Sequence, residues 1–156
     1  MKISDILEEP MVVTNLPGTT KEQIINAMID IVARSPKVLD KDKIRSAILE
    51  REKIMSTGVG NGFAIPHGKT DAVTEIVAAF GITAEPINYQ SLDDKPVRLV
   101  FLLIGKDNLV GPHIKLLSRI SRLMNKENFR NKLLSTTSAH DIIETFKEEE
   151  ATYLEM

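Results

Sequence analysis

The chain has 156 residues, 42% of them hydrophobic and 27% charged, which is the composition of a soluble globular domain large enough to bury its own core. It contains no cysteine, and this excludes a disulfide scaffold, thiolate metal ligands and a cysteine nucleophile. The 20 basic and 22 acidic residues give a formal net charge of -2, so the chain lacks the broad basic field of proteins that bind nucleic acid.

The amino-terminal residues favour a cytoplasmic location. An early acidic residue, Asp5, and the lack of a long apolar run argue against a secretion signal. The longest apolar stretches, such as residues 99–104, are far shorter than the roughly 20 residues that cross a bilayer. We therefore expect a cytoplasmic protein that is not embedded in a membrane.

Two helices are predicted in the first third of the chain. Thr19 and Glu22 have the spacing of a capping box, and the apolar residues behind them recur at helical intervals until Pro36 ends the pattern. Asp40 is predicted to cap a second helix, whose last turn carries Arg51.

A loop and three strands are predicted next. Residues 56–62 read Ser-Thr-Gly-Val-Gly-Asn-Gly, which is too rich in glycine for a helix or strand and predicts a loop. Strand signals follow at residues 63–66, 76–82 and 97–104. The last of these is an almost continuous apolar run, typical of a strand covered on both faces. Residues 86–96 are rich in Pro, Asn and Asp and predict a turn-rich connection.

Three more helices are predicted in the last third. The first begins after Gly111-Pro112, the second lies at about residues 129–134, and the third is capped by Ser138. An acidic tail, Glu148–Glu150, follows. No linker or repeat divides the chain, so we predict a single α/β domain with helices packed on a central sheet. The strand order is not predicted.

The chemistry is concentrated in residues 57–69. We expect an anion-binding loop there, because glycines at alternate positions let backbone amides approach a ligand; its members are Thr57, Gly58, Gly60 and Gly62. His67 follows directly, and Gly68 leaves its imidazole uncrowded. A nucleophilic ring beside an anion-receptive backbone is what a phosphohistidine requires. One ring nitrogen would attack phosphorus while a backbone carbonyl orients the other.

Two nucleotide-binding motifs are excluded by spacing. Residues 62–70 resemble a P-loop, but five residues rather than four separate Gly62 from Gly68. The three alternate glycines give G-x-G-x-G, which is not the dinucleotide fingerprint G-x-G-x-x-G.

Two further residues are predicted to assist His67. His113 follows Pro112 in the first turn of a helix, where free amides disfavour an imidazolium and favour a nearby phosphate. A neutral His113 could then donate a hydrogen bond to a phosphoryl group on His67. Arg51 carries a permanent guanidinium that can hold phosphate oxygens in a fork, a few residues before the glycine segment.

Plainer interpretations remain open for each of these residues. His67 and His113 could be ordinary packed histidines, and Arg51 could be a surface residue paired along its helix. His140 has no predicted role. The residues Lys115, Arg119, Arg122 and Lys126 recur at helical intervals and predict a solvated face. No metal is expected, because no third ligand is recognisably placed beside the two histidines.

Three stretches resemble the IIA proteins of the fructose, mannitol and nitrogen-regulatory branch of the sugar phosphotransferase system. They are Arg51-Glu52 with residues 56–60, residues 62–69 (Gly-Phe-Ala-Ile-Pro-His-Gly-Lys), and residues 100–104 with 113–117. The resemblance covers about residues 3–147 of a single type-2 IIA domain expected over 1–156. Phe63 stands where the family has a smaller aliphatic residue, a departure expected to affect packing more than chemistry.

The resemblance implies a mannitol-type IIA fold, an α/β sandwich with a mixed sheet. It implies that His67 accepts phosphate on its tele nitrogen from HPr or the nitrogen-branch paralogue of HPr, with His113 and Arg51 stabilising the phosphoryl group. No cofactor is expected.

Three functions stay open. A transport-type member passes the phosphate to a cysteine on a IIB domain during fructose or mannitol uptake, whereas a regulatory member binds targets according to its phosphorylation state. The 156 residues include no IIB or IIC segment, which favours regulation. A degenerate member would bind a small anion and transfer nothing. The sugar, the onward acceptor and the oligomeric state are not predicted.

Overall fold

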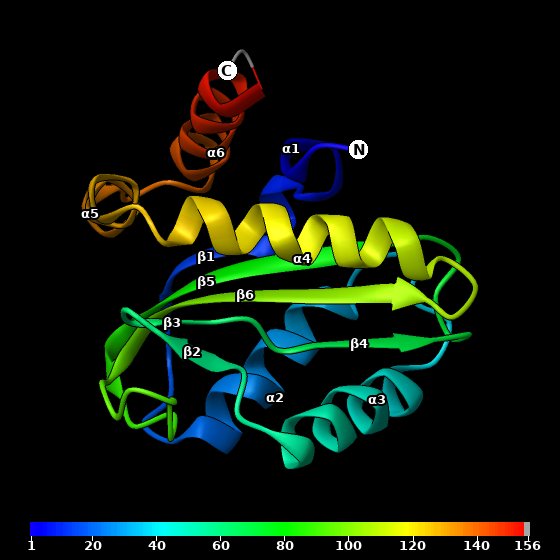
Figure 1. Cartoon of the computed structure of the whole chain (residues 1–156). Coiled ribbons are helices and arrows are strands. Elements are labelled where there is room, and N and C mark those ends of the chain that lie inside the picture. The colour runs from blue at the N-terminus through cyan, green and yellow to red at the C-terminus, as the bar shows by residue number, and fades with distance from the viewer. Residues whose placement is uncertain (155–156) are drawn as a thin grey trace.

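Six strands form one mixed sheet in the computed structural model, which describes residues 1–154 (Figure 1). They are β1 (Val12–Leu16), β2 (Gly58–Gly60), β3 (Phe63–Ala64), β4 (His67–Thr70), β5 (Val77–Ile87) and β6 (Val97–Lys106). Their order across the sheet is β1-β5-β6-β3-β2, and β4 also pairs with β6. The β5–β6 and β2–β3 pairs are antiparallel, and the other pairs are parallel.

Strands β3 and β4 follow one another along the same side of β6. Phe63 of β3 pairs with Leu99, and His67 of β4 pairs with Leu103, four residues further along. The chain therefore steps along β6 between the two short strands and presents His67 near the carboxyl end of the central strand.

Helices cover both faces of this sheet (Figure 1). They are α1 (Ile3–Ile6), the 3-10 helix η1 (Glu9–Met11), α2 (Lys21–Val32), α3 (Lys41–Ile54), α4 (Val110–Met124), α5 (Glu127–Ser135) and α6 (Ala139–Leu154). Helices α2 and α3 pack on one face, and α4, α5 and α6 pack on the other together with α1.

The central strand β6 shows why both faces must be covered. Its residues alternate between two cores: Val100 and Leu102 pack with α2 and α3, whereas Leu99 and Phe101 pack with the helices of the opposite face. All four side chains are almost completely buried. The continuous apolar run therefore becomes a strand buried on both sides, as predicted.

Helix α3 starts where the sequence predicts it, and helix α2 is shifted by one residue. Helix α4 starts at Val110, so Pro112 lies inside its first turn and not before it. Asp40 caps α3, and its carboxylate accepts hydrogen bonds from the amides of Asp42 and Lys43. The cap of α2 is Thr20 rather than Thr19: its hydroxyl accepts from the amide of Gln23, and the Gln23 side chain accepts in turn from the amide of Thr19. Adjacent threonines make the two registers hard to separate by pattern alone.

The predicted loop at residues 56–62 is wrong in part. Residues 58–60 form strand β2, which returns through Asn61 and Gly62 to β3. Both turn residues have positive φ, 58° and 79°, as a tight type I′ hairpin requires. Strand β1, strand β4 and helix α1 were not predicted, because each is short and lacks a clear apolar period.

The acidic residues 148–150 continue helix α6 and do not form a tail. Glu150 is buried, and its carboxylate accepts hydrogen bonds from the amides of Ile3 and Ser4 at 2.6 and 2.9 Å. These amides lie at the start of α1, where a helix has free donors. Among the helices that the structure describes, each is too short or too polar to span a bilayer.

Candidate functional site

His67 is the first residue of β4 and is half-buried. Its Nδ1 atom lies 2.7 Å from the carbonyl oxygen of Ile65, two residues earlier. A carbonyl only accepts, so Nδ1 carries the proton and donates it. The other nitrogen, Nε2, is then unprotonated in the neutral ring and keeps its lone pair. The geometry selects Nε2 as the nucleophile.

The surroundings of His67 keep the ring neutral. Burial lowers its pKa below the usual value, and the positive charge of Arg51 lowers it further. The hydrogen bond to Ile65 and the charge of Glu52 oppose this effect without reversing it. At neutral pH the uncharged, nucleophilic form therefore predominates.

His113, in the first turn of α4, lies beside His67. The two ring centroids are 5.9 Å apart, with an angle of 48° between the ring planes. His113 is only 3% exposed, and burial together with the charges of His67 and Lys69 lowers its pKa to about 4. His113 is therefore neutral at physiological pH, as predicted, but the cause is burial and nearby positive charge rather than the helix terminus, because the His113 amide already donates to the carbonyl of Leu109.

The packing of His113 also selects its tautomer. Nδ1 is buried against Gly105 of β6, where an added Cβ would lie only 2.3 Å from it. This nitrogen has no hydrogen-bond partner among residues 1–154. A buried N–H without an acceptor is more costly than an unpaired acceptor, so the proton belongs on Nε2. His113 can thus donate from Nε2.

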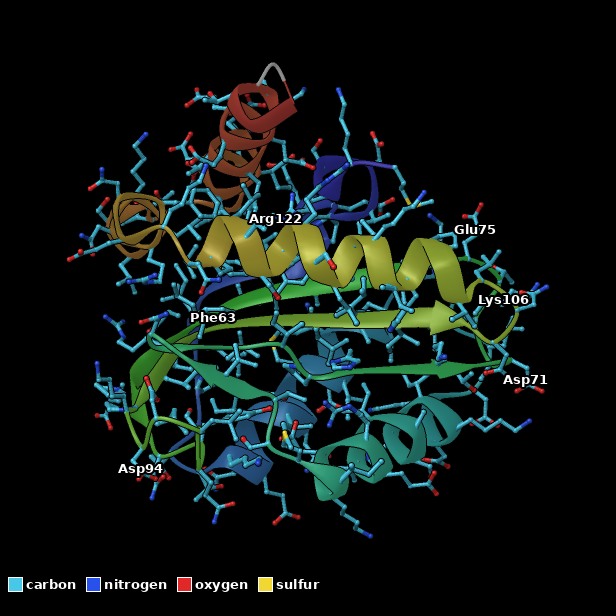
Figure 2. The ribbon with its side chains drawn as sticks, viewed as in Figure 1. Phe63, Asp71, Glu75, Asp94, Lys106 and Arg122 are labelled. Atoms are coloured by element: carbon cyan, nitrogen blue, oxygen red, sulfur yellow. The ribbon has the colours of Figure 1, made fainter. Side chains whose placement is uncertain are left out.

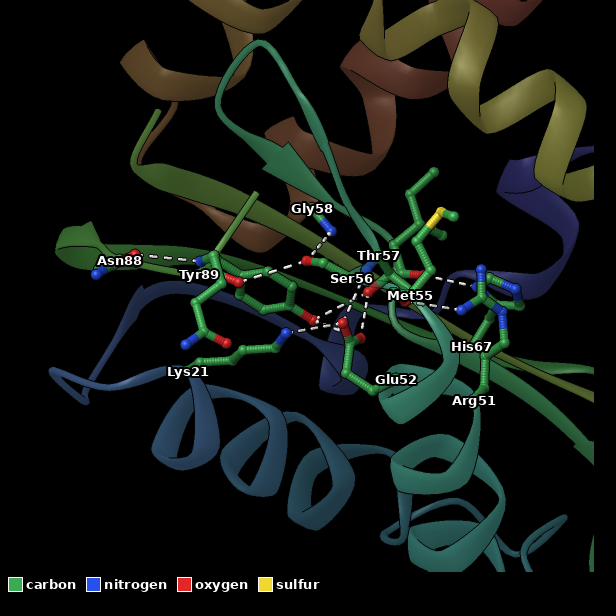
Figure 3. A network of polar contacts seen from close by, with 12 residues as sticks. Lys21, Arg51, Glu52, Met55, Ser56, Thr57, Gly58, His67, Asn88 and Tyr89 are labelled. Carbon is green, nitrogen blue, oxygen red and sulfur yellow. Dashed lines mark hydrogen bonds and ion pairs between the residues drawn. The ribbon is translucent and has the colours of Figure 1, made fainter. Parts of the chain in front are cut away.

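Arg51 comes from the last turn of α3. Its Nη1 atom donates a hydrogen bond of 2.8 Å to the carbonyl oxygen of Met55, which fixes the side chain over the end of its helix. Figure 3 shows the guanidinium beside the His67 imidazole, and its charge acts on that ring. The structure therefore brings His67, His113 and Arg51 together, as predicted.

The structure does not gather the predicted anion-binding loop around His67. The amide of Thr57 donates to Glu52 and that of Gly58 to the hydroxyl of Ser56, so both are occupied. Gly60 and Gly62 lie at the tip of the β2–β3 hairpin. Phe63, which follows this tip, pairs with Leu99 of β6, whereas His67 pairs with Leu103. The tip is therefore about 13 Å from His67, the length of four residues along a strand. Gly60 and Gly62 therefore shape the hairpin turn, and Gly58 allows close packing against Ser91 and Tyr89.

Sequence reasoning missed a buried polar network next to this site (Figure 3). Glu52 accepts hydrogen bonds from Thr57 and from the hydroxyl of Tyr89, and forms an ion pair with Lys21. Its members come from α2, α3 and the segments before β2 and after β5. Nothing local in the sequence connects Lys21 with Tyr89, so only the fold could reveal the network.

The surface near the site carries a hollow that His67 does not line and several exposed apolar side chains. A hollow of about 810 Å³ lies on the other side of Glu52, between the start of α2 and the end of α3, and His67 does not line it. Exposed apolar side chains instead adjoin the site: Ile54, Met55 and Ile114 are 80%, 55% and 56% exposed. Large apolar side chains left in water are typical of a surface that meets another protein.

The remaining candidates stay outside the site. His140 lies on α6 within 3.8 Å of a carboxylate oxygen of Glu9. In the predicted basic row, Arg119 of α4 donates to the carbonyl of Met1. Lys126 lies beyond the end of α4, just before α5, and pairs with Glu149. Within residues 1–154, no three histidine or acidic side chains are grouped as a metal would need.

Comparison with known proteins identifies the class of protein. Residues 5–149 match the model of the family described as "Phosphoenolpyruvate-dependent sugar phosphotransferase system, EIIA 2". The match spans nearly the whole chain and includes His67, His113 and Arg51, so this is a component of a phosphotransferase system. The chain belongs to the EIIA 2 family, whose members are phosphoryl carriers.

Relatives in this family carry two kinds of name. The chain is 36% identical to the fructose-specific EIIA component of Haloferax volcanii, over 94% of this chain and 95% of that protein. It is 32% identical to a nitrogen regulatory protein of Bradyrhizobium diazoefficiens, over 91% and 92%. It is also 36% identical to the fructose-specific EIIABC component of Bacillus subtilis, over 92% of this chain but only 23% of that longer protein.

Solved structures share the fold. The nitrogen regulatory protein IIA-Ntr of Neisseria meningitidis superposes with a TM-score of 0.86 at 29% identity, over 92% of this chain and 98% of that one. The mannitol IIA of Escherichia coli, solved in complex with phosphorylated mannitol IIB, superposes with a TM-score of 0.78 at 22% identity, over 92% and 99%. The predicted mannitol-type IIA fold with its mixed sheet is confirmed.

Proposed function

We propose that the chain accepts a phosphoryl group on Nε2 of His67 from HPr or the nitrogen-branch paralogue of HPr, and passes it to a second protein. The observation that carries this proposal is the hydrogen bond from Nδ1 of His67 to the Ile65 carbonyl. It commits the proton to one nitrogen and leaves the lone pair of the other, the tele nitrogen, directed away from the bond.

The reaction can be written from this geometry. The Nε2 lone pair attacks the phosphorus of a phosphohistidine on the donor, the P–N bond of the donor breaks, and its electron pair returns to the donor ring. The His67 ring gains positive charge as the new P–N bond forms. The Ile65 carbonyl, already bound to Nδ1–H, stabilises that charge.

His113 and Arg51 are proposed to stabilise the transferring group. Nε2–H of His113 would donate to a phosphoryl oxygen, and the guanidinium of Arg51 would bind others while its Nη1 stays on Met55. His113 suits this role because its proton on Nε2 can be donated to the phosphoryl group, while its lone pair on Nδ1 is buried against Gly105 and cannot compete for phosphorus.

The apolar side chains around the site support a protein, rather than a small molecule, as donor and acceptor. Ile54 and Met55 follow Arg51, and Ile114 follows His113, so an incoming protein would contact them while its reactive group reaches His67. Apolar side chains at the centre of a surface patch are typical of protein interfaces.

Transport and regulation both have support as the onward role. Transfer to a IIB domain during fructose- or mannitol-type uptake is favoured by the fructose-specific relative of matching length, and by the mannitol IIA that was solved with its phosphorylated IIB. Control of regulatory targets is favoured by the nitrogen regulatory relative and by the structural likeness to IIA-Ntr. We place transport first, since the fructose-specific relative is the more similar in sequence.

The first test is labelling of the purified chain with phosphoenolpyruvate, enzyme I and HPr, followed by intact mass. We expect one phosphoryl group on the wild-type chain, labile in acid and stable in base. His67→Ala should abolish labelling. His113→Ala should still label but transfer onward about a hundredfold more slowly, since it loses one donor to the transition state. Full labelling of the His67 variant would contradict the assignment.

The second test separates the two roles. The phosphorylated chain is mixed with a fructose- or mannitol-type IIB domain, and loss of its phosphoryl group is followed by mass. Transfer supports the transport role. A chain that keeps its label with IIB, and binds a partner differently before and after phosphorylation, supports regulation. No labelling in the first test would leave only an anion-binding protein.

A further inference from the structure

Glu52 is a buried carboxylate that the proposed chemistry does not use. Its side chain is 7% exposed, in a region where an unpaired charge would be costly. Four donors surround it: the amide of Thr57 at 2.7 Å, the Thr57 hydroxyl, the Tyr89 hydroxyl at 3.1 Å, and the ammonium of Lys21 at 3.0 Å (Figure 3). Such complete pairing indicates a defined role.

The charge of this carboxylate is retained at neutral pH. Burial alone raises the pKa of Glu52, but the hydrogen bonds from Thr57 and the contact with Lys21 outweigh it and hold the pKa below its usual value. Lys21 also lies over the ring of Tyr89, 4.6 Å from its centroid, which fixes the ammonium in place.

A continuous line of hydrogen bonds leads from Glu52 to the reactive ring. Glu52 holds the amide of Thr57, the Thr57 carbonyl accepts from the amide of Ile65 at 3.0 Å, and the Ile65 carbonyl accepts from Nδ1 of His67 at 2.7 Å. Thr57 and Ile65 each connect two of these hydrogen bonds, one through the backbone N–H and one through the backbone carbonyl. The position of the carbonyl that sets the His67 tautomer therefore depends on where Glu52 holds Thr57.

The same carboxylate shapes the end of α3. Helix α3 ends at Ile54, and Met55 is extended, with φ of -164°. Arg51 binds the Met55 carbonyl and its neighbour Glu52 binds the Thr57 amide, so two adjacent side chains fix the segment that leaves their helix. Release of Thr57 would loosen both the Ile65 carbonyl and the anchor of Arg51.

We propose that Glu52 is a positioning residue, which acts through Thr57 and Ile65 to hold His67 with its proton on Nδ1 and its lone pair on Nε2. The effect of Glu52 on the His67 tautomer in the free protein does not depend on the proposed function, whereas its effect on the rate of phosphoryl transfer rests on that function. The role depends on the reach of the side chain to the Thr57 amide rather than on its charge.

Reach and charge can be separated by two conservative variants. Glu52→Asp keeps the charge but is one methylene too short to hold Thr57 from a fixed helix. Glu52→Gln loses the charge but keeps the reach, and its amide oxygen can accept from the Thr57 N–H while its NH₂ faces the two hydroxyls, which can accept. Asp40→Ala is the matched control, because it removes the cap at the opposite end of the same helix.

The first measurement is the tautomer of His67, from the ring ¹⁵N shifts of the ¹⁵N-histidine-labelled free chain at alkaline pH. Wild type, Glu52→Gln and Asp40→Ala should show protonation at Nδ1 only. Glu52→Asp should show both tautomers. The second measurement is the rate of labelling: Glu52→Asp should be at least about tenfold slower, since a misplacement near 1 Å can cost a hundredfold, and Glu52→Gln should stay within about threefold of wild type.

Several results would overturn the proposal. A folded Glu52→Asp chain with the wild-type tautomer and rate shows that the line of hydrogen bonds is not needed. If Glu52→Gln is labelled slowly and Glu52→Asp is labelled at the wild-type rate, the charge of Glu52 matters and not its reach. If Asp40→Ala is labelled as slowly as Glu52→Asp, the slower labelling reflects a general loss of stability of α3 and not the positioning of His67. If wild type itself is not labelled, the proposed function fails, and the tautomer measurement still decides the role of Glu52.

Discussion

At the scale of single residues, two imidazoles in contact are held in complementary states. His67 has its proton on Nδ1 because a carbonyl accepts it there, and His113 has its proton on Nε2 because its Nδ1 is enclosed by Gly105. One ring therefore offers a lone pair and the other a donor. Both pKa values are lowered, so neither ring has to lose a proton first at neutral pH.

The buried neutral His113 predicts a dependence of stability on pH. The unfolded chain binds a proton at His113 near pH 6.5, whereas the folded chain does so only near pH 4. Between these values the unfolded state holds more protons, so the free energy of unfolding falls as the pH falls through this window. The effect of His113 is up to about 3 kcal/mol.

This dependence is measured by urea unfolding between pH 7 and pH 4.5, roughly the window in which His113 titrates. The difference between wild type and His113→Asn isolates the histidine from the carboxylates that also titrate in acid. The stability advantage of wild type over the variant should shrink as the solution is acidified. A difference that stays constant, or grows, would contradict the assignment of His113 as a buried neutral base.

At the scale of elements, two glycines with different tasks flank the chemistry. Gly62 has φ of 79° in the turn between β2 and β3, whereas Gly105 in β6 has ordinary backbone angles and leaves room for the His113 ring. The first supports a hairpin about 13 Å from His67, and the second supports the site directly.

Substitution of alanine should therefore affect mainly stability at Gly62 and mainly phosphoryl transfer at Gly105. Gly62→Ala should lower the free energy of unfolding by about 1 kcal/mol, because a left-handed conformation is strained for alanine, while labelling of the folded chain stays unchanged. Gly105→Ala should slow onward transfer at least about tenfold, because its Cβ would displace the His113 ring. Slow labelling of Gly62→Ala would instead support the anion-binding loop predicted from the sequence.

At the scale of the whole molecule, the two ends of the chain are joined on the face opposite α2 and α3. Glu150 of α6 accepts from the amides of Ile3 and Ser4, and apolar side chains of α1 and α6 belong to one core. The two helices lie on the same side of the sheet (Figure 1 and Figure 2). The family resemblance covers residues up to about 147. The contacts of Glu150 with the amides of Ile3 and Ser4 show that the packed domain continues beyond that position.

Glu150→Ala should lower the free energy of unfolding by roughly 2 kcal/mol, since it leaves two amides without an acceptor. Glu150→Gln, which keeps one acceptor oxygen, should lose less. Both are measured by chemical denaturation, and the folded variants should still be labelled at His67. An unchanged midpoint for Glu150→Ala would mean that the contact contributes nothing to folding.

Much of the fold could be predicted because long apolar patterns dominate it. The run at residues 97–104 indicated the central strand, and Asp40 and Ser138 indicated helix starts that the structure confirms. Strand β4 escaped prediction because its Lys69 is exposed and only four residues pair with β6. Such a strand is defined by its neighbour rather than by its own period.

The sequence indicated the three side chains that the structure brings together, but not the contacts that hold them in place. His67, His113 and Arg51 carry functional groups whose uses are limited, so residue type and local context indicated them. The predicted anion-binding glycines do not gather around His67, because glycine frequency cannot distinguish a ligand site from a tight turn. Glu52 was missed because its partners Lys21 and Tyr89 lie 31 and 37 positions away in sequence, beyond any local pattern.

Both histidines are positioned against strand β6, His67 from β4 and His113 from α4, and this arrangement limits how a phosphorylated chain can be recognised. His67 is paired to Leu103, and His113 packs on Gly105 only two residues further along. One rigid strand thus fixes the spacing of the two rings, without a hinge between them. We therefore expect a dianion on His67 to leave the spacing of the two rings unchanged. A partner that distinguishes the two forms must therefore sense the new charge at the surface itself, and should respond to ionic strength more than to any change of shape.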